Sequence, residues 1–223
     1  MPPDIDPYLS PNQLALVQSL TSPPKIQAFL DSVTYSPEDT YRCPLQVLQD
    51  RLAHCLDGGL FAAAMLRRLG YPPLVVDLFP DPGMDDDHVL AVYRYKGYLG
   101  CIAKSNYVGL RYREPVFRSL RELVMSYFED FYNVDGVKTL RSYTPTLDLA
   151  RFDHLEWMWR SDGLEQIVDH MFHKMRRYVI ATPEMTGWLA PVDKRFFDAG
   201  MYGANPDGLY HPQKTGSASD AQD

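Results

Sequence analysis

The stretch of sequence that decides the fold is Arg51-Leu-Ala-His-Cys-Leu-Asp-Gly-Gly-Leu-Phe-Ala-Ala-Ala-Met-Leu-Arg-Arg-Leu-Gly70, in which Cys55 opens an apolar run. A glycine closes the run, as is typical of the residue that follows a helix C-terminus, so we expect a helix from Cys55 to about Gly70. Small residues follow the cysteine at Gly58, Gly59 and Ala62 to Ala64. They allow this helix to pack closely against a neighbouring element.

After the helix the hydrophobic period changes from helical to strand-like. A tight turn at Lys96-Gly97 predicts that two of the three strand-like runs form a hairpin. The three runs are Leu74 to Phe79, His88 to Tyr95 and Tyr98 to Ala103. The sequence therefore predicts a Cys55 helix that packs against an antiparallel sheet, with His88 at the mouth of a strand 33 residues after Cys55.

Flanking segments complete an α+β fold within one domain over 1–213. Short helices are expected at Asn12 to Leu20, Lys25 to Ser32 and Leu45 to about His54. From about 120 the pattern predicts a helical C-terminal part, beginning with a helix over Leu120 to Tyr132. The last segment, 214–223, is small and polar and is expected to be disordered.

Composition excludes several classes of function. The 223-residue chain has a formal net charge of −7, which argues against binding of nucleic acid because phosphate neutralisation requires a basic face. We see no secretory signal and no apolar run long enough to cross a bilayer, which predicts a chain without a membrane role. The three cysteines suggest free thiols in a reducing compartment, so we expect a cytoplasmic protein.

Cys55 and His88 are the candidate reactive pair. The free N–H groups at a helix N-terminus stabilise a thiolate, so we expect the Cys55 thiol to be more acidic than in free solution. Each residue alone has a simpler interpretation, a buried structural cysteine and a solvated turn histidine. Their predicted placement on adjoining elements favours a nucleophile and its general base.

In this respect the sequence resembles the transglutaminase-like superfamily, cysteine enzymes with a papain-related core. Cys55, Leu69-Gly70 and the run from His88 to Val92 match the family pattern in order and spacing, over about residues 42 to 107. The resemblance implies a papain/transglutaminase-like core with the catalytic-type helix packed on the sheet. It also implies an Asp near the end of the Tyr98 to Ala103 strand, where this chain has none.

Asn106 is the best substitute for that Asp, since an amide oxygen can orient an imidazole. A strand-ending turn is the alternative interpretation of Asn106. Gln49 is a candidate for oxyanion stabilisation, with a solvated helix surface as its alternative. His54 is interpreted as a histidine at the C-terminal end of the preceding helix, where it favours the helix dipole, and Asp57 as a capping residue in the first turn of the Cys55 helix. The pair His170 and His173 lacks the further ligands that a zinc site needs, so no metal and no cofactor are expected.

The sequence predicts a thiol-dependent acyl-transfer enzyme, of peptidase/amidase or transglutaminase type, that uses Cys55, His88 and Asn106. Its substrate would be a peptide or another amide or ester. The alternative is a catalytically degenerate transglutaminase-like protein that binds a ligand or a protein, and a third hypothesis is an interaction module with an aromatic C-terminal half. The oligomeric state does not follow from the sequence.

Overall fold

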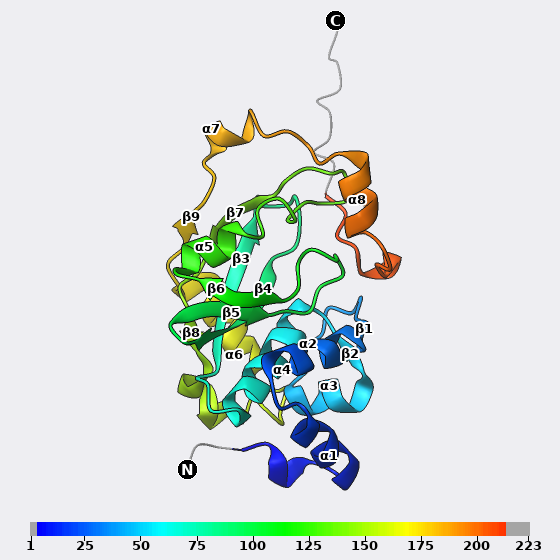
Figure 1. The fold of residues 1–223 in the computed structure, drawn as a ribbon, viewed down its shortest axis with the longest axis vertical. Helices are drawn as coiled ribbons and strands as arrows, with labels where there is room; N and C mark the ends of the chain where they lie inside the picture. Colours follow the sequence, from blue (N-terminus) through cyan, green and yellow to red (C-terminus); the bar gives the residue numbers. More distant parts are fainter. Residues whose placement is uncertain (1–3, 213–223) are drawn as a thin grey trace, which may run out of the picture.

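A seven-stranded antiparallel sheet with the helix α4 packed against one face organises the chain (Figure 1). The computed structural model describes residues 4–212. The helices are α1 (Pro11–Ser19), α2 (Pro23–Asp31), α3 (Pro44–Asp50), α4 (Cys55–Arg68), α5 (Leu120–Met125), α6 (Leu164–Asp169), α7 (Pro183–Thr186) and α8 (Lys194–Gly200). The strands are β1 (Thr34–Tyr35), β2 (Leu52–Ala53), β3 (Leu74–Pro80), β4 (His88–Tyr95), β5 (Tyr98–Ile102), β6 (Arg113–Phe117), β7 (Leu140–Tyr143), β8 (Leu147–Asp148) and β9 (Tyr178–Val179). Short 3-10 or π turns are η1 (Asp6–Tyr8), η2 (Leu149–Leu155), η3 (His170–Lys174) and η4 (Pro206–Gly208).

The predicted Cys55 helix is confirmed as α4, and its ends are defined by local chemistry. At the N-terminus the His54 ring accepts a hydrogen bond from the backbone N–H of Leu56, and the Asp57 carboxylate accepts one from the backbone N–H of His54. These bonds satisfy donors that a helix start leaves free. At the other end Gly70 has a φ of 88°, the left-handed conformation that favours glycine.

The predicted antiparallel sheet is also confirmed. Its strand order is β6-β5-β4-β3-β7-β9, with β8 paired to β3 outside this path. Lys96 and Gly97 both have positive φ values, 47° and 91°, and join β4 to β5 in the tight hairpin expected from the sequence. On the other side of β4, His88 lies opposite Leu78 of β3.

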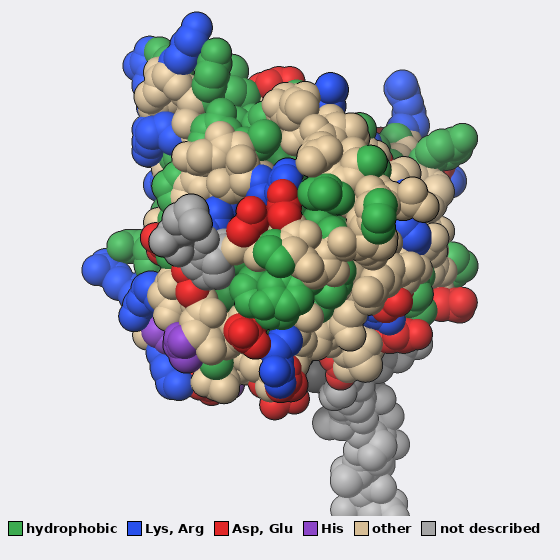
Figure 2. All heavy atoms as spheres, turned by 90° about the horizontal axis from the view of Figure 1, so that it is seen from below, with side chains coloured by type: hydrophobic (Ala, Val, Ile, Leu, Met, Phe, Trp, Pro, Cys, Tyr) green, Lys and Arg blue, Asp and Glu red, His purple; other side chains and the backbone are tan. Residues whose placement is uncertain are grey.

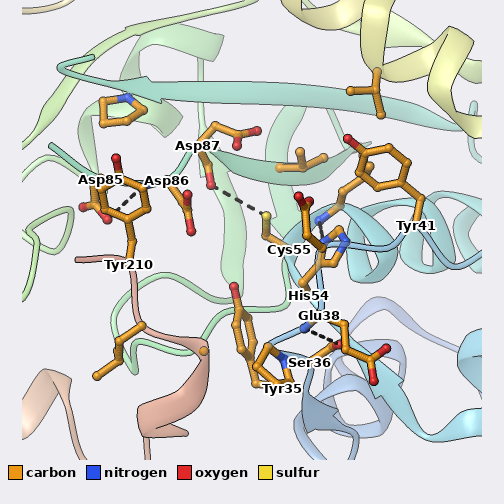
Figure 3. A pocket seen from close by; sticks show the side chains of 18 of the residues that line it. Tyr35, Ser36, Glu38, Tyr41, His54, Cys55, Asp85, Asp86, Asp87 and Tyr210 are labelled. Carbon is orange, nitrogen blue, oxygen red and sulfur yellow. Dashed lines mark hydrogen bonds between the residues drawn. The ribbon is translucent and has the colours of Figure 1, made fainter. Parts of the chain in front are cut away.

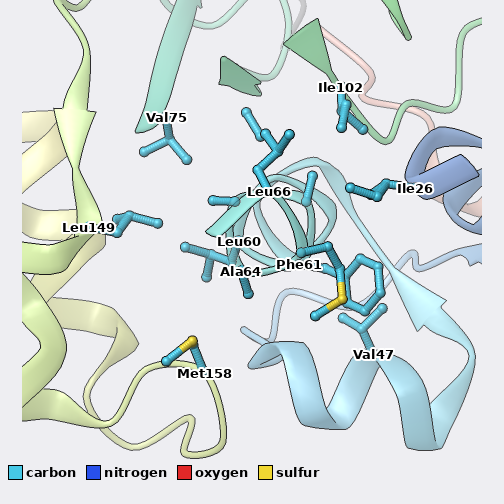
Figure 4. Close-up of a cluster of buried hydrophobic side chains, with 14 of the residues drawn as sticks. Ile26, Val47, Leu60, Phe61, Ala64, Leu66, Val75, Ile102, Leu149 and Met158 are labelled. Carbon is cyan, nitrogen blue, oxygen red and sulfur yellow. The ribbon is translucent and has the colours of Figure 1, made fainter. Parts of the chain in front are cut away.

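Alternate residues of β4 face two different cores. Val89, Ala91 and Tyr93 belong to the cluster around α4, which Figure 4 shows in part, whereas Leu90 and Val92 belong to a second cluster on the other face. This alternation follows from the two-residue period of a strand. The glycines of α4 permit the close packing predicted for them, since a Cβ on Gly59 would lie 2.7 Å from Val89 Cγ1.

Two predicted helices are shorter than expected. The third helix ends at Asp50, where Arg51 takes a left-handed φ of 57°, and β2 follows as a parallel partner of β1. An extended residue is needed at His54 to cap α4, so one helix cannot run into the next. The helix that begins at Leu120 ends at Met125 instead of Tyr132.

The expectation of a helical C-terminal part is wrong in part. Helices do occur beyond residue 120, but β7, β8 and β9 lie there too and join the central sheet. The strands are two to four residues long, too short for the two-residue period to be recognised in the sequence. The predicted disordered tail over 214–223 lies outside the described residues.

The surface carries both signs of charge. On the face seen in Figure 2, basic and acidic side chains are interspersed over short distances, with hydrophobic side chains between them. Among residues 4–212 no helix combines the length and the apolar character that a membrane span requires.

Candidate ligand-binding site

Cys55 is the first residue of α4 and lines a pocket of about 720 Å³ (Figure 3). Its thiol donates a hydrogen bond to the backbone oxygen of Asp87, at a sulfur–oxygen distance of 3.6 Å. Four parts of the chain form most of the walls: the segment before α3, the turn that leads into β4, residues between 168 and 177, and residues 207–211 near the end of the described chain. The sulfur is therefore placed where a ligand in the pocket could touch it.

Carboxyl groups dominate the polar lining of this pocket. Six acidic side chains line it: Glu38, Asp39, Asp85, Asp86, Asp87 and Asp207. Burial raises the pKa of Asp85 to about 7 and that of Asp86 to about 6. The only Lys or Arg among the lining residues is Arg177, which stacks over the Phe79 ring at 3.6 Å. Glu38 is ion-paired with Arg42, which lies outside the lining. For the other five acidic groups, Arg177 is the only lining Lys or Arg among the described residues.

Beneath the pocket, Asp77 of β3 lies against Asp87. Asp77 is fully buried. Among the described residues, neither of its carboxyl oxygens has a hydrogen-bond partner. Burial and the charge of Asp87 raise the pKa of Asp77 well above its ordinary value of 3.8. The raised pKa favours a neutral Asp77 beside the Asp87 carboxylate, so that the pair holds one proton.

The electrostatics of the pocket oppose an acidic thiol at Cys55. Burial, and then the negative charge of Asp87, raise the pKa of this thiol well above its ordinary value. The sequence predicted the opposite shift from the position of Cys55 at a helix N-terminus. The prediction failed because burial and neighbouring carboxylates outweigh the helix terminus.

His88 does not meet Cys55 in this structure, which corrects the predicted juxtaposition. Its ring packs against Tyr127 and Phe131 in the second core cluster, and Nε2–H donates to the backbone oxygen of Leu110 at 2.7 Å. Burial lowers the pKa of His88 to about 4. The ring therefore lies on the face of β4 that carries Leu90 and Val92, and it borders a small space of about 30 Å³ beside Asp87. Among the described residues the thiol and the imidazole make no hydrogen bond to each other.

Asn106 does not orient His88 either. Its amide Nδ2–H donates to the backbone oxygens of Asn205 at 2.8 Å and of Gly208 at 3.1 Å, and its Oδ1 accepts from the backbone N–H of Asn205 at 2.7 Å. The amide is therefore occupied by the C-terminal segment, and the strand-ending alternative is closer to its actual role.

The remaining predicted residues have structural surroundings. Gln49 is exposed on α3 and does not line the pocket, so its amide is not near the thiol. Asp57 caps α4 as expected from the sequence, whereas His54 is the N-cap of α4 and does not end the preceding helix, which stops at Asp50. Within residues 4–212, no group of three or more His, Cys, Asp or Glu side chains has an arrangement suited to a metal ion.

Sequence reasoning missed Asp77 and did not connect Asp87 with the thiol, although the charges of both act on Cys55. An Asp in the middle of the apolar run Leu74-Val-Val-Asp-Leu-Phe79 was the available signal, because a charge inside a buried strand requires a partner. For Asp87 the signal was alternation: if His88 faces one side of the sheet, Asp87 faces the other.

Comparisons with known proteins leave the family open. No protein-family model and no curated protein matches the sequence. Two solved structures of Legionella pneumophila LapG are similar over part of their length, each at a TM-score of 0.34 and 14% identity. The match covers 45% of this chain and 66% of the EGTA-treated LapG chain, and 55% and 91% in the other structure. Such values do not establish a shared fold or activity, and membership of the transglutaminase-like superfamily stays a prediction.

Proposed function

We propose that the Cys55 pocket binds a small ligand that carries positively charged amino groups, and that the chain acts as a ligand-binding protein. This is the degenerate alternative predicted from the sequence, with a ligand class added. The observation that carries it is the pocket lining: five carboxyl groups besides the Arg42-paired Glu38 stand with Arg177 as the only lining Lys or Arg among the described residues. The turned-away ring of His88 supports binding over Cys–His catalysis.

The unbalanced carboxyls explain the affinity that we expect. An ammonium group about 4 Å from a carboxylate gains up to about 4 kcal/mol at an effective dielectric constant of 20, and loss of water from both groups offsets much of this. A net contribution of about 1–3 kcal/mol per charged hydrogen bond remains. A pocket of about 720 Å³ is of the size that takes small molecules.

Isothermal titration calorimetry of the full chain near pH 7.5 tests this proposal. The probes are 1,4-diaminobutane and spermidine, with succinate as the oppositely charged control. We expect saturable binding of both amines, tighter for spermidine, and none for succinate. Absence of saturable binding for both amines, or binding of succinate, would contradict the proposal.

Matched variants localise the binding. Asp39→Asn and Asp207→Asn each remove one charge from the pocket lining, whereas Asp135→Asn removes one from an exposed position that does not line it. The two pocket variants should weaken spermidine binding by about tenfold, the equivalent of about 1.4 kcal/mol, and the control should not. Equal weakening in all three would mean that spermidine responds only to net charge.

Thiol-dependent acyl transfer, the function predicted first from the sequence, is the second candidate. The observation that favours it is the position of the Cys55 sulfur, at the first residue of α4 and on the pocket wall. A peptide, amide or ester substrate would be attacked by the thiolate, and the thiol proton would pass to the leaving group. In this conformation Asp87, and not His88, is the ionisable group beside the thiol.

A covalent-intermediate assay separates the two candidates. If Cys55 transfers acyl groups, p-nitrophenyl acetate should release nitrophenol in a burst, and intact-mass analysis should show an acetyl group that Cys55→Ala lacks. Binding alone predicts no burst and the same amine affinity in Cys55→Ala as in the wild type.

A further inference from the structure

The C-terminal segment from Asn205 to His211, which we call the strap, forms part of the wall of the Cys55 pocket. Residues 207–211 form one wall of that pocket, although they lie more than 150 positions from Cys55 in the chain. Asn205, at the start of the strap, lines a neighbouring cavity of about 540 Å³. A third space, of about 30 Å³, lies between the two and is lined by Gly208 and Tyr210.

Tyr35 lines all three spaces, and the strap stands beside it. The three spaces therefore adjoin one another around Tyr35 and the strap. The carboxyl groups of Asp85, Asp86 and Asp87 border both the Cys55 pocket and the small space. Figure 3 shows Tyr210 of the strap next to Asp85 and Asp86.

Few contacts hold the strap in place, and one side chain supplies most of its hydrogen bonds. Asn106 makes three hydrogen bonds to the backbone of Asn205 and Gly208, and the Asn205 side chain donates to the backbone oxygen of Tyr35 at 3.1 Å. Leu209 adds a partly buried contact with the second core cluster. The strap pairs with no strand among the described residues.

Close packing at Gly208 keeps the strap against Tyr35. A Cβ at this position would lie 2.8 Å from Tyr35 Cδ1, which is closer than such atoms approach, so a side chain there would force the strap and the ring apart. The hydrogen bonds of Asn106 and the missing side chain of Gly208 thus both keep the strap close to Tyr35.

We propose that the strap is a lid over the Cys55 pocket, that Asn106 is the positioning residue that latches it, and that a ligand enters when the latch opens. This proposal depends on the proposed function in one respect, which is that the pocket receives a ligand. Segments held by few buried contacts and by hydrogen bonds open locally at lower free energy than the core of a sheet. Loss of the latch should therefore expose Cys55 without unfolding the sheet.

Labelling of Cys55 by two reagents of different size tests the lid. Rates with iodoacetamide and with the bulky fluorescein-5-maleimide are measured by peptide mass spectrometry near pH 8.5, in the full-length wild type, Asn106→Ala and Gly208→Val. Asn12→Ala, at an exposed position of α1, is the matched control. We expect both strap variants to raise the maleimide rate by about tenfold or more and the iodoacetamide rate by less, with no change in the control.

Folded strap variants that label like the wild type would overturn the proposal. If the variants do not fold, hydrogen exchange of the wild type decides: residues 205–211 should exchange much faster than β4, and equal protection would overturn the lid. Neither measurement uses an amine, so failure of amine binding and failure of the lid are distinguishable.

Discussion

Replacement of Asp77 by asparagine should stabilise the protein at neutral pH, because it removes a proton that the folded state must hold. Burial and Asp87 raise the pKa of Asp77 well above 3.8, so the folded chain keeps a proton that the unfolded chain releases. A raised carboxyl pKa makes the free energy of unfolding fall as pH rises above the unfolded-state pKa. The cost is about 1.4 kcal/mol per pH unit, or at most about 4 kcal/mol between pH 3.8 and pH 7.

The Asp77→Asn side chain keeps the shape of the carboxyl and donates an N–H to the Asp87 carboxylate without needing a proton from solution. We therefore expect Asp77→Asn and the wild type to be similar in stability near pH 4. The variant should be more stable by as much as about 4 kcal/mol near pH 7. Asp135→Asn, at an exposed position, should leave the pH dependence unchanged.

Urea unfolding followed by tryptophan fluorescence measures the effect at pH values between 4 and 7. The decisive quantity is the difference in free energy of unfolding between variant and wild type as a function of pH. A difference that does not grow with pH, or a variant less stable than the wild type at pH 7, would refute the shared proton.

Three further predictions follow from the same structure. The pKa of His88, lowered to about 4 by burial, should leave its ring NMR signals unchanged from pH 8 to pH 5.5 in the wild type and in Cys55→Ala; titration near pH 6.5 would contradict its burial. The raised pKa of the Cys55 thiol should make iodoacetamide labelling of Cys55 slow at pH 7 and faster above pH 9. Saturating spermidine should accelerate the labelling by lowering that pKa. Fast labelling at pH 7 without spermidine would contradict the raised pKa. Gly59→Ala should destabilise the protein by about 1–3 kcal/mol in urea unfolding, because the new Cβ would lie 2.7 Å from Val89 Cγ1; an unchanged midpoint would show that α4 can move away from the sheet.

The sequence predicted the elements around α4 because their signals are local. Capping by Asp57, the left-handed glycine at Gly70 and the turn at Lys96-Gly97 each depend on a few neighbouring residues. The short strands β7 to β9 gave no such signal, since their pairing with the sheet is decided by tertiary contacts.

The candidate site was predicted with the right elements and the wrong face of one strand. The sequence predicted that His88 lies on the side of Cys55, whereas the two-residue period of β4 places it on the face of Leu90 and Val92. Both faces of β4 are apolar, with Val89 and Ala91 on one and Leu90 and Val92 on the other. Hydrophobicity therefore does not indicate which face of β4 packs on α4. A shift of the strand register by one residue exchanges the two faces.

The central claim is that an acidic, uncompensated pocket binds amines, and the pH dependence of spermidine affinity tests it most directly. Spermidine should bind more tightly as pH rises from about 5.5 to about 8, because ionisation of Asp85, with a pKa of about 7, and Asp86, with a pKa of about 6, favours the bound cation. In calorimetry, Asp85→Asn should reduce that dependence. Affinity that is constant over this range, or that falls with rising pH, would contradict the account.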